Sequence, residues 1–463
     1  MSTRIERDTV GELQIDPEAY YGVQSKRAEH NFQITGQLMR SEMIKSLAQI
    51  KKASALANEA AGRIPSDKIK AIIQACDEII EGKLHDQFIC DPVQGGAGTS
   101  ANMNANEVIA NRAEEILGGT KGDYKLVHPN DHVNLSQSTN DVFPTAGKLT
   151  VITLIKEMLP KLEALAKALR AKGEEAGDLI RVGQTQLQDA LPMYMKEVFF
   201  AYASALERDI EHIKEMEKYM YINNMGATAI GSGANGNKDY MNTINKYLSD
   251  VTGFPMETAD NLFDGTQNLD GFTIISGALR AAAVSLSKMS NDLRLLSSGP
   301  RTGRREIQLP PRQNGSSIMP GKVNPVIPEV VSQVAYLVIG NDTTITMCAE
   351  GGQLQLNAFE PVLFYKLFES IYALGQAAET LRVNCVEGII YNKEIVQESL
   401  ENSLVMVTAL CPVMGYTKAA DLAKKAMREN KSLREVVLAE TDIKEAELDE
   451  ILDPVKLATP PNA

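Results

Sequence analysis

The hydrophobic positions in the middle of the chain predict long helices. Between residues 272 and 298, apolar side chains recur at alternating steps of four and three residues, which is the spacing of one packed helix face. The members of this seam are Ile275, Leu279, Ala282, Leu286, Met289, Leu293 and Leu296. Gly299 and Pro300 follow directly, and this pair is a strong signal for the end of a helix.

Four further segments carry a helical pattern. A second seam opens near Pro361, which suits a first helical turn, and comprises Phe364, Leu367, Ile371, Leu374, Ala378 and Leu381. Two more helices are expected over residues 144–170, with a kink at Pro160, and over residues 193–220. A fifth is expected after residues 325–328 and ends near Met347. Turn-rich stretches between the helices disfavour the alternative of a coiled-coil rod.

Five helices of about 20 residues, against a usual mean of about 12, predict a bundle of nearly parallel helices. We therefore expect a mainly α-helical protein with three domains. These are a mixed helical domain over residues 1–138, the long central five-helix bundle over residues 139–390, and a small helical domain over residues 391–463. Long apolar seams leave stripes that need a partner, so we also expect a homo-oligomer.

Composition and charge mainly exclude function classes. The formal net charge of −13 argues against a nucleic-acid partner and against an anionic membrane surface. The chain has no run of 18 apolar residues and no apolar secretion segment near Met1, so we expect no membrane partner. The five cysteines are scattered and show no metal-ligand spacing, which predicts reduced thiols in a cytoplasmic protein.

Four polar, glycine-containing segments interrupt the helical pattern. They are rich in Ser, Thr, Asn and Gln and poor in His, Asp and Glu, and they cover residues 94–107, 133–145, 183–192 and 315–325. Each alone could be a loop with helix caps. Most of them precede a predicted helix, where free backbone N–H groups favour anions. Gathered in space, they predict a site for a small dianion.

The fourth segment, GSSIMPGKVNP, carries the most specific signal. Gly315 and Gly321 allow the backbone to bend and close as a lid. Ser316 and Ser317 offer hydroxyls beside adjacent backbone N–H groups, which can stabilise a developing negative charge. The segment also supplies a fixed cation and a neutral amide, Lys322 and Asn324.

Other signals lack the context that their chemistry needs. Residues 231–236 spell GxGxxG, but no strand pattern surrounds them, which argues against a dinucleotide site. Residues 95–99 lack the GK[ST] of a phosphate-binding loop, and the five histidines have no metal-ligand spacing. We therefore expect neither a cofactor nor a metal. None of the four segments contains His, so the general base must be another residue type.

At these four segments, in this order, the sequence resembles the aspartase/fumarase superfamily. GSSIMPGKVNP matches the signature loop of that superfamily, and the resemblance extends over nearly the whole chain, including AYYGVQ at residues 19–24. QGGAGTS at residues 94–100 and AEGGQLQLN at residues 349–357 resemble the ammonia-lyase branch. In the segment that corresponds to residues 94–100, fumarases tend to read QTGSGTQ. The resemblance implies a mainly α three-domain fold and a homotetramer in which each active site draws on three subunits.

The resemblance also implies an activity and a set of site residues. The activity is reversible deamination of L-aspartate to fumarate and ammonia, in which loss of a Cβ proton gives an enediolate that needs stabilising donors. The residues implied to hold the β-carboxylate are Thr99, Ser138, Thr139 and Ser317. Those implied to hold the α-carboxylate are Thr185, Lys322 and Asn324. Asn140 is implied to bind the amino group with help from Gln186, and Ser316 is implied to be the base. Glu329 is a candidate to orient Lys322.

Two positions in the third segment depart from the most common pattern. Gln184 stands where the superfamily usually has Arg, so a charge is lost beside Thr185. Gln186 is typical of some aspartases, whereas other aspartases and the fumarases have His. Two alternatives remain open, namely a fumarate hydratase on the same fold and a catalytically silent storage relative such as a lens crystallin. The intact Ser316, Lys322 and Asn324 argue against the silent relative.

Overall fold

The structure is a computed structural model that describes residues 3–459, and most of these residues are helical. Their contacts divide the chain into two compact units. The first unit comprises the residues up to Pro160, together with Glu211–Ala283 and Tyr336–Gly375. The second comprises Lys161–Ile210, Val284–Ala335 and the residues from Gln376 onward. The long helices contribute residues to both units.

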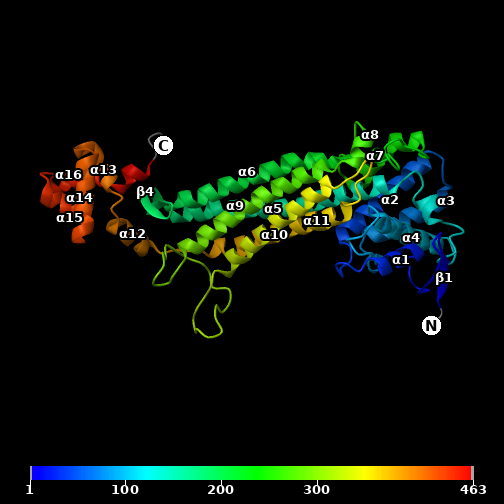
Figure 1. The fold of residues 1–463 in the computed structure, drawn as a ribbon, viewed down its shortest axis with the longest axis horizontal. Helices are drawn as coiled ribbons and strands as arrows, with labels where there is room; N and C mark the ends of the chain where they lie inside the picture. The colour runs from blue at the N-terminus through cyan, green and yellow to red at the C-terminus, as the bar shows by residue number, and fades with distance from the viewer. Residues whose placement is uncertain (1–2, 460–463) are drawn as a thin grey trace. The chain divides into compact units, whose positions relative to one another are not determined.

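All five predicted long helices are present. They run alongside one another in Figure 1 and are α5 (Thr139–Ala176), α6 (Met195–Tyr221), α9 (Asp270–Leu296), α10 (Val326–Glu350) and α11 (Glu360–Asn384). Helix α5 is longer than expected and continues through Pro144 and Pro160. A proline removes only one backbone hydrogen bond, and packing along a bundle can offset that loss. The mainly α fold with a long five-helix bundle is confirmed.

The predicted apolar seams form the core of this bundle. Every member of the seam on α9 and of the seam on α11 is buried. In the first unit, the Phe364 ring lies between Phe143 of α5 and Phe272 of α9, with ring centroids 5.3 and 5.0 Å away. In the second unit, the Tyr202 hydroxyl on α6 donates to Asp292 of α9 at 2.8 Å. Helical periodicity therefore identified the packed faces correctly.

The N-terminal part of the first unit consists of shorter elements. Strands β1 (Arg4–Arg7) and β2 (Glu12–Ile15) form an antiparallel hairpin, which the sequence analysis did not anticipate. The helices of this part are α1 (Val23–Asn31), α2 (Ser41–Ala60), α3 (Ser66–Ile80), α4 (Thr99–Ile116), α7 (Lys238–Thr252) and α8 (Leu262–Gln267). Helix α2 packs against α3 and α7. The glycines of residues 231–236 lie in the loop before α7 and belong to neither strand of the two-residue parallel pair β5 (Ile222–Asn223) and β6 (Glu257–Thr258).

The second unit adds short elements to the ends of the long helices. Strands β3 (Ile180–Thr185) and β4 (Gln188–Tyr194) form an antiparallel hairpin, and β7 (Ile307–Gln308) pairs with β8 (Ile390–Tyr391). The C-terminal helices are α12 (Lys393–Asn402), α13 (Val407–Met414), α14 (Tyr416–Glu429), α15 (Leu433–Glu440), α16 (Glu445–Ile451) and α17 (Pro454–Ala458). Their shared core includes Leu410, Leu422, Val437 and Leu448. The three-domain division with boundaries near residues 138 and 390 stays a prediction.

Two further observations concern the whole described chain. All five cysteines are free thiols, and only Cys411 is not fully buried. Within residues 3–459, no helix combines the length and the apolar character needed to cross a lipid bilayer.

Candidate active site

The first polar segment ends at the start of α4. Gly98 is the residue before the helix and adopts a φ of +84°, a conformation that favours glycine. A Cβ at Gly98 would overlap the Phe143 ring of α5, so this glycine lets two of the polar segments approach closely. The exposed Thr99 hydroxyl donates to the Gly96 carbonyl at 2.7 Å. Because a carboxylate only accepts hydrogen bonds, Thr99 can bind one only after its hydroxyl turns away from Gly96.

The second polar segment forms the first turn of α5. Ser138 precedes the helix, and its hydroxyl accepts a hydrogen bond from the Asn140 N–H at 3.2 Å. The Asp141 carboxylate accepts from the Ser138 N–H at 2.9 Å and from the Thr228 N–H at 3.0 Å. The Ser138 hydroxyl and the Asp141 carboxylate thus satisfy backbone N–H groups at the start of the helix, which explains why the helix begins here. Burial raises the pKa of Asp141 to about 7, while these N–H groups and the charge on Lys51 oppose the shift.

Contacts from the loop before α7 fix the orientation of the Asn140 side chain. Its Nδ2 donates to the Ala229 carbonyl at 2.7 Å, and its backbone carbonyl accepts from Asn224 Nδ2 at 2.9 Å. A carbonyl can only accept, so the amide nitrogen of Asn140 must face Ala229. Its oxygen Oδ1 then remains as an acceptor, which is the polarity that a substrate ammonium group needs.

A direct hydrogen bond joins the first two polar segments. Asn102 Nδ2, on α4, donates to Thr139 Oγ1, on α5, at 2.9 Å. Thr99, Ser138, Thr139 and Asn140 therefore belong to neighbouring parts of the first unit. The sequence analysis did not single out Asn102, Asp141 or the Ala229 carbonyl. The alternating asparagines at positions 102, 104 and 106 inside a helix were the available signal for Asn102, because Asn is an unfavourable interior residue.

The third polar segment is the tip of the hairpin formed by β3 and β4, not a loop before a helix. Its two turn residues, Gln186 and Leu187, have φ values of +54° and +64°, as in the tight turns of two-residue hairpins. Non-glycine residues in this conformation cost free energy and are often found at functional sites. Thr185 and Gln186 are both exposed at this tip.

Gln184, which stands where the superfamily usually has Arg, makes a side-chain hydrogen bond to a carboxylate. Gln184 Nε2 donates to Asp189 Oδ1 across the hairpin at 3.0 Å. The Ser403 hydroxyl, next to α12, donates to the other oxygen of Asp189 at 3.3 Å. The Gln184 side chain thus makes a cross-strand hydrogen bond within the hairpin.

The fourth polar segment is a loop that folds on itself before α10. The Gly315 N–H donates to the Lys322 carbonyl at 2.7 Å, and Asn324 Nδ2 donates to the Gly315 carbonyl at 2.7 Å. A Cβ at Gly315 would lie 2.6 Å from the Lys322 carbonyl oxygen, so this closure requires glycine. Ser316 Oγ accepts hydrogen bonds from the backbone N–H groups of Met319 at 2.9 Å and Ile318 at 3.2 Å. Two donors on one hydroxyl oxygen stabilise negative charge on it.

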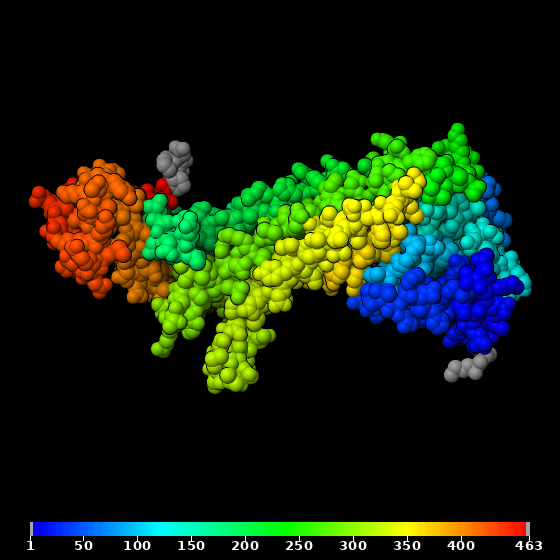
Figure 2. Space-filling view, in the orientation of Figure 1, coloured from blue at the N-terminus to red at the C-terminus, as the bar shows by residue number. Residues whose placement is uncertain are grey.

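This loop, residues 315–325, protrudes from the second unit and is called the lid below. The lid forms part of the yellow-green projection in Figure 2, and the Ile318 side chain is 84% exposed. Ser317 and Lys322 are exposed as well, and in residues 3–459 no hydrogen bond or ion pair engages the Lys322 ammonium. Glu329, in the first turn of α10, makes no ion pair with it in this conformation, so its orienting role stays a prediction. The described hydrogen bonds of the lid stay within it or join it to the first turn of α10, and those of Thr185 and Gln186 stay within their hairpin.

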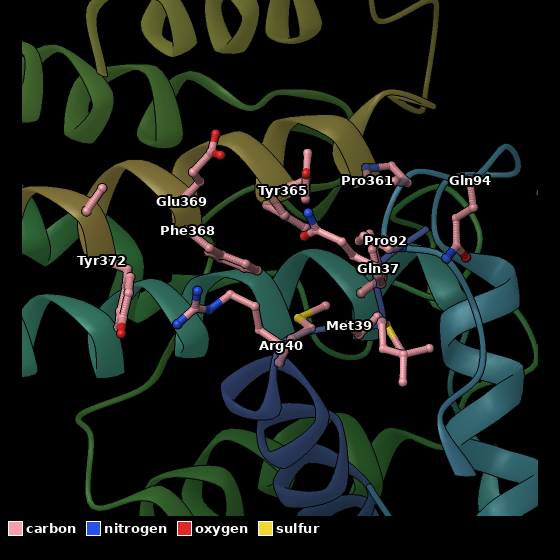
Figure 3. A pocket seen from close by; sticks show the side chains of 15 residues that line it. Gln37, Met39, Arg40, Pro92, Gln94, Pro361, Tyr365, Phe368, Glu369 and Tyr372 are labelled. Carbon is pink, nitrogen blue, oxygen red and sulfur yellow. The ribbon is translucent and has the colours of Figure 1, made fainter. Parts of the chain in front are cut away.

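A separate cavity in the first unit has a different chemistry. It measures about 220 Å³ and is lined mainly by apolar and aromatic side chains, as Figure 3 shows. In the lining of this cavity, the Arg40 guanidinium lies 4.6 Å from the centre of the Tyr372 ring. None of the predicted site residues lines this cavity, and an apolar lining does not suit a dianion. Across the described part of the chain, no cluster of three His, Cys, Asp or Glu side chains is arranged to hold a metal ion.

Comparison with known proteins identifies the family. The model of a family described as lyase matches residues 11–340, and a model described as fumarase C C-terminus matches residues 406–459. The chain belongs to the aspartase/fumarase superfamily of lyases. It is 48% identical over 457 residues to the aspartate ammonia-lyase of Bacillus subtilis (strain 168), covering 99% of this chain and 96% of that protein. It is 50% identical over 460 residues to the aspartate ammonia-lyase of Helicobacter pylori (strain ATCC 700392 / 26695), covering 99% and 98%.

Solved structures of this superfamily share the fold. A cobalt-bound crystal structure named fumarate lyase:delta crystallin, from Brucella melitensis, has a TM-score of 0.96 and 46% identity, covering 99% of this chain and 100% of that one. A class II fumarase from Schistosoma mansoni has a TM-score of 0.95 and 35% identity, covering 100% of both chains. The fumarase is thus similar in fold, but it is less similar in sequence than the ammonia-lyases.

Proposed function

We propose that this chain is a carbon–nitrogen lyase that converts L-aspartate reversibly to fumarate and ammonia. The observation that carries the proposal is the geometry of Ser316, whose hydroxyl oxygen already accepts two backbone N–H groups inside a glycine-closed lid. The near 50% identity to aspartate ammonia-lyases over almost the whole chain supports the same substrate, a small dicarboxylate.

Ser316 is the base in this mechanism. The Met319 and Ile318 N–H groups stabilise its alkoxide, and the nearby Lys322 ammonium of the same lid adds positive charge. The alkoxide takes a proton from Cβ, and the electron pair of the C–H bond moves onto the β-carboxylate as an enediolate. The pair then forms the C=C bond while the C–N bond breaks, and ammonia leaves with the electrons of that bond.

Hydroxyl and amide groups, together with the Lys322 ammonium, hold the two carboxylates. Donors to the β-carboxylate stabilise the charge that builds up in the enediolate, and they are Thr99, Ser138, Thr139 and Ser317. The α-carboxylate does not gain charge, so its ligands mainly position the substrate, and they are Thr185, Lys322 and Asn324. Glu329, just after the lid, orients Lys322 once the lid has closed on the substrate.

The amino group is bound by acceptors. Asn140 Oδ1 is available for it because the Ala229 carbonyl holds the amide nitrogen. The Gln186 side-chain oxygen, at the hairpin tip, is the second acceptor. A site built from neutral acceptors binds the ammonium form of aspartate and releases ammonia without a histidine.

Assembly completes the site, and we propose a cytoplasmic homotetramer in which three subunits contribute to each active site. Helix α10 carries a solvent-facing stripe with heptad spacing, and its apolar members include Val330, Leu337 and Met347, the last 68% exposed. The band from yellow-green to yellow in Figure 2 shows α10 open at the surface of this single chain. Such a stripe suits packing against the same helix of other copies. Five free thiols fit a reducing compartment.

A spectrophotometric assay tests the proposal. Fumarate absorbs in the near ultraviolet, so purified protein mixed with L-aspartate is expected to give rising absorbance and equimolar ammonia. Replacing Ser316 with Ala is expected to remove turnover by a factor of about 10³ or more while leaving the assembly intact. A fully active Ser316→Ala variant contradicts the role of Ser316 as base.

Two outcomes separate this activity from the alternatives. Turnover of L-malate with none of L-aspartate indicates a fumarate hydratase. Turnover of neither substrate by folded, assembled protein indicates a catalytically silent relative.

A further inference from the structure

A buried polar network lies beneath the first turn of α5. The Lys51 ammonium, on α2, donates to Asn134 Oδ1 and to Gln137 Oε1, both at 2.9 Å. Asn134 Oδ1 also accepts from Asn102 Nδ2 at 3.2 Å and from Asn106 Nδ2 at 3.1 Å, both on α4. One side-chain oxygen therefore accepts hydrogen bonds from three different donors.

The orientation of each amide in this network is forced by its neighbours. Burial lowers the pKa of Lys51 to about 7, and its ammonium form has no acceptor, so in that form it requires the Asn134 oxygen to face it. The Asn134 nitrogen is independently placed, because it donates to the Gln137 carbonyl at 3.3 Å. Asn102 must then turn its nitrogen toward Asn134. Its own oxygen Oδ1 is buried without a partner among the described residues, which shows that the Asn134 contact decides its orientation.

This orientation determines what the Thr139 hydroxyl can do. The second hydrogen of Asn102 Nδ2 points to Thr139 Oγ1 at 2.9 Å, so that oxygen accepts. Within residues 3–459, no hydrogen bond uses the Thr139 hydroxyl as a donor. Its hydrogen is left for a group outside the network. A carboxylate can only accept, so this is the polarity that a β-carboxylate ligand requires.

We propose that Asn102 is a positioning residue that commits the Thr139 hydroxyl to donate to the substrate, through a relay of forced donor–acceptor contacts from Lys51 and Asn134. The inference rests on the proposed function, since it takes Thr139 as a ligand of the β-carboxylate. The charge on that carboxylate increases in the enediolate, so the loss of this donor is felt mainly in kcat and less in KM.

The decisive variant is Asn102→Asp, which keeps the shape and reverses the polarity. An aspartate carboxylate accepts the Thr139 hydrogen and removes it from the substrate. The kcat/KM for L-aspartate is expected to fall about 10- to 100-fold, the value of one hydrogen bond to a charged group. Asn102→Ala removes the donor to Thr139 without replacing it by an acceptor. It is expected to lower kcat/KM only about threefold, because the Thr139 hydroxyl is then free to occupy three staggered rotamers.

Asn104→Asp is the matched control. Asn104 lies on the same helix and is equally buried, but it donates to the Gln87 carbonyl and has no part in the relay. It is expected to keep kcat/KM within about threefold of the unaltered protein. Turnover by the unaltered protein and by this control tests the proposed function separately. If both fail to act on L-aspartate, the proposed function is wrong whatever Asn102 does.

A double-mutant cycle with Thr139→Val completes the test. Without the Thr139 hydroxyl, Asn102→Asp is expected to change kcat/KM by less than about threefold, because the two residues act as one unit. An equal loss in both backgrounds overturns the proposal, and so does a loss from Asn102→Ala as large as that from Asn102→Asp. If Asn102→Asp does not assemble, the cycle is run with Asn102→Ala. The roughly threefold loss of kcat/KM caused by Asn102→Ala must then be absent in the Thr139→Val background. If the loss persists there, the proposal is overturned.

Discussion

A single added methyl group at Gly98 is expected to disturb both the fold and the site. Gly98 sits at the start of α4 with a φ of +84°, and a Cβ there would overlap the Phe143 ring of α5. Gly98→Ala therefore imposes two costs. The left-handed conformation costs an alanine about 1–2 kcal/mol, and forcing extra volume into a packed core costs roughly 1–3 kcal/mol. Together they predict a loss of about 2–5 kcal/mol in the free energy of unfolding.

Two other glycines separate these costs. Gly118 has a φ of +81° and nothing within 4 Å of an added Cβ, so Gly118→Ala measures the conformational cost alone. Gly147 lies inside α5, where a Cβ would overlap the Phe364 ring, so Gly147→Ala measures the crowding cost. In this helical position the crowding is partly offset by about 0.5–1 kcal/mol, the preference of a helix for alanine over glycine.

The assay is urea unfolding at one fixed protein concentration, because the apparent stability of a protein that self-associates, as proposed here, depends on concentration. Gly98→Ala is expected to unfold at clearly lower urea than Gly118→Ala. Displacement of Phe143 also moves the first turn of α5 away from Thr99, so kcat/KM for L-aspartate is expected to fall at least tenfold. If Gly98→Ala is no less stable than Gly118→Ala, the ring contact is not as close as the structure indicates, and the reasoning fails.

Two further predictions concern pH and assembly. The Arg112 guanidinium donates to both Glu78 oxygens, at 2.7 and 2.9 Å, and holds the pKa of Glu78 below its usual 4.5. Because the folded protein lowers this pKa, the ionised Glu78 stabilises the fold above about pH 4.5, and this stabilisation is lost as pH falls. At pH 7, Glu78→Gln is therefore expected to be less stable than the unaltered protein by roughly 0.5–1 kcal/mol. The difference should shrink near pH 3.5 in thermal melts, and a constant difference contradicts the assignment. Leu337→Glu, on the exposed stripe of α10, is expected to yield smaller species than the unaltered protein by light scattering, whereas an unchanged mass excludes that stripe from the proposed interface.

The sequence by itself determined the long helices and their packed faces. The seams on α9 and α11 are strict enough that each predicted member is buried. Apolar spacing of this kind is informative because an apolar stripe on a helix is stable only when it is buried, and here the long helices of the bundle bury both seams. The sequence also singled out the segment that forms the lid, where the Ser316 hydroxyl accepts from the Ile318 and Met319 N–H groups. The role of Ser316 as base stays a prediction.

The tertiary structure alone decided how the polar residues face. The third polar segment is a hairpin tip, because its strands pair with each other and the turn residues accept positive φ values that no local pattern announced. Asn102, Asn134 and Lys51 are far apart in sequence, and only their burial together forces each amide into one orientation. Hydrogen-bond polarity depends on which partner each group meets. A sequence supplies donors and acceptors, whereas the fold decides which of them remains free for a substrate.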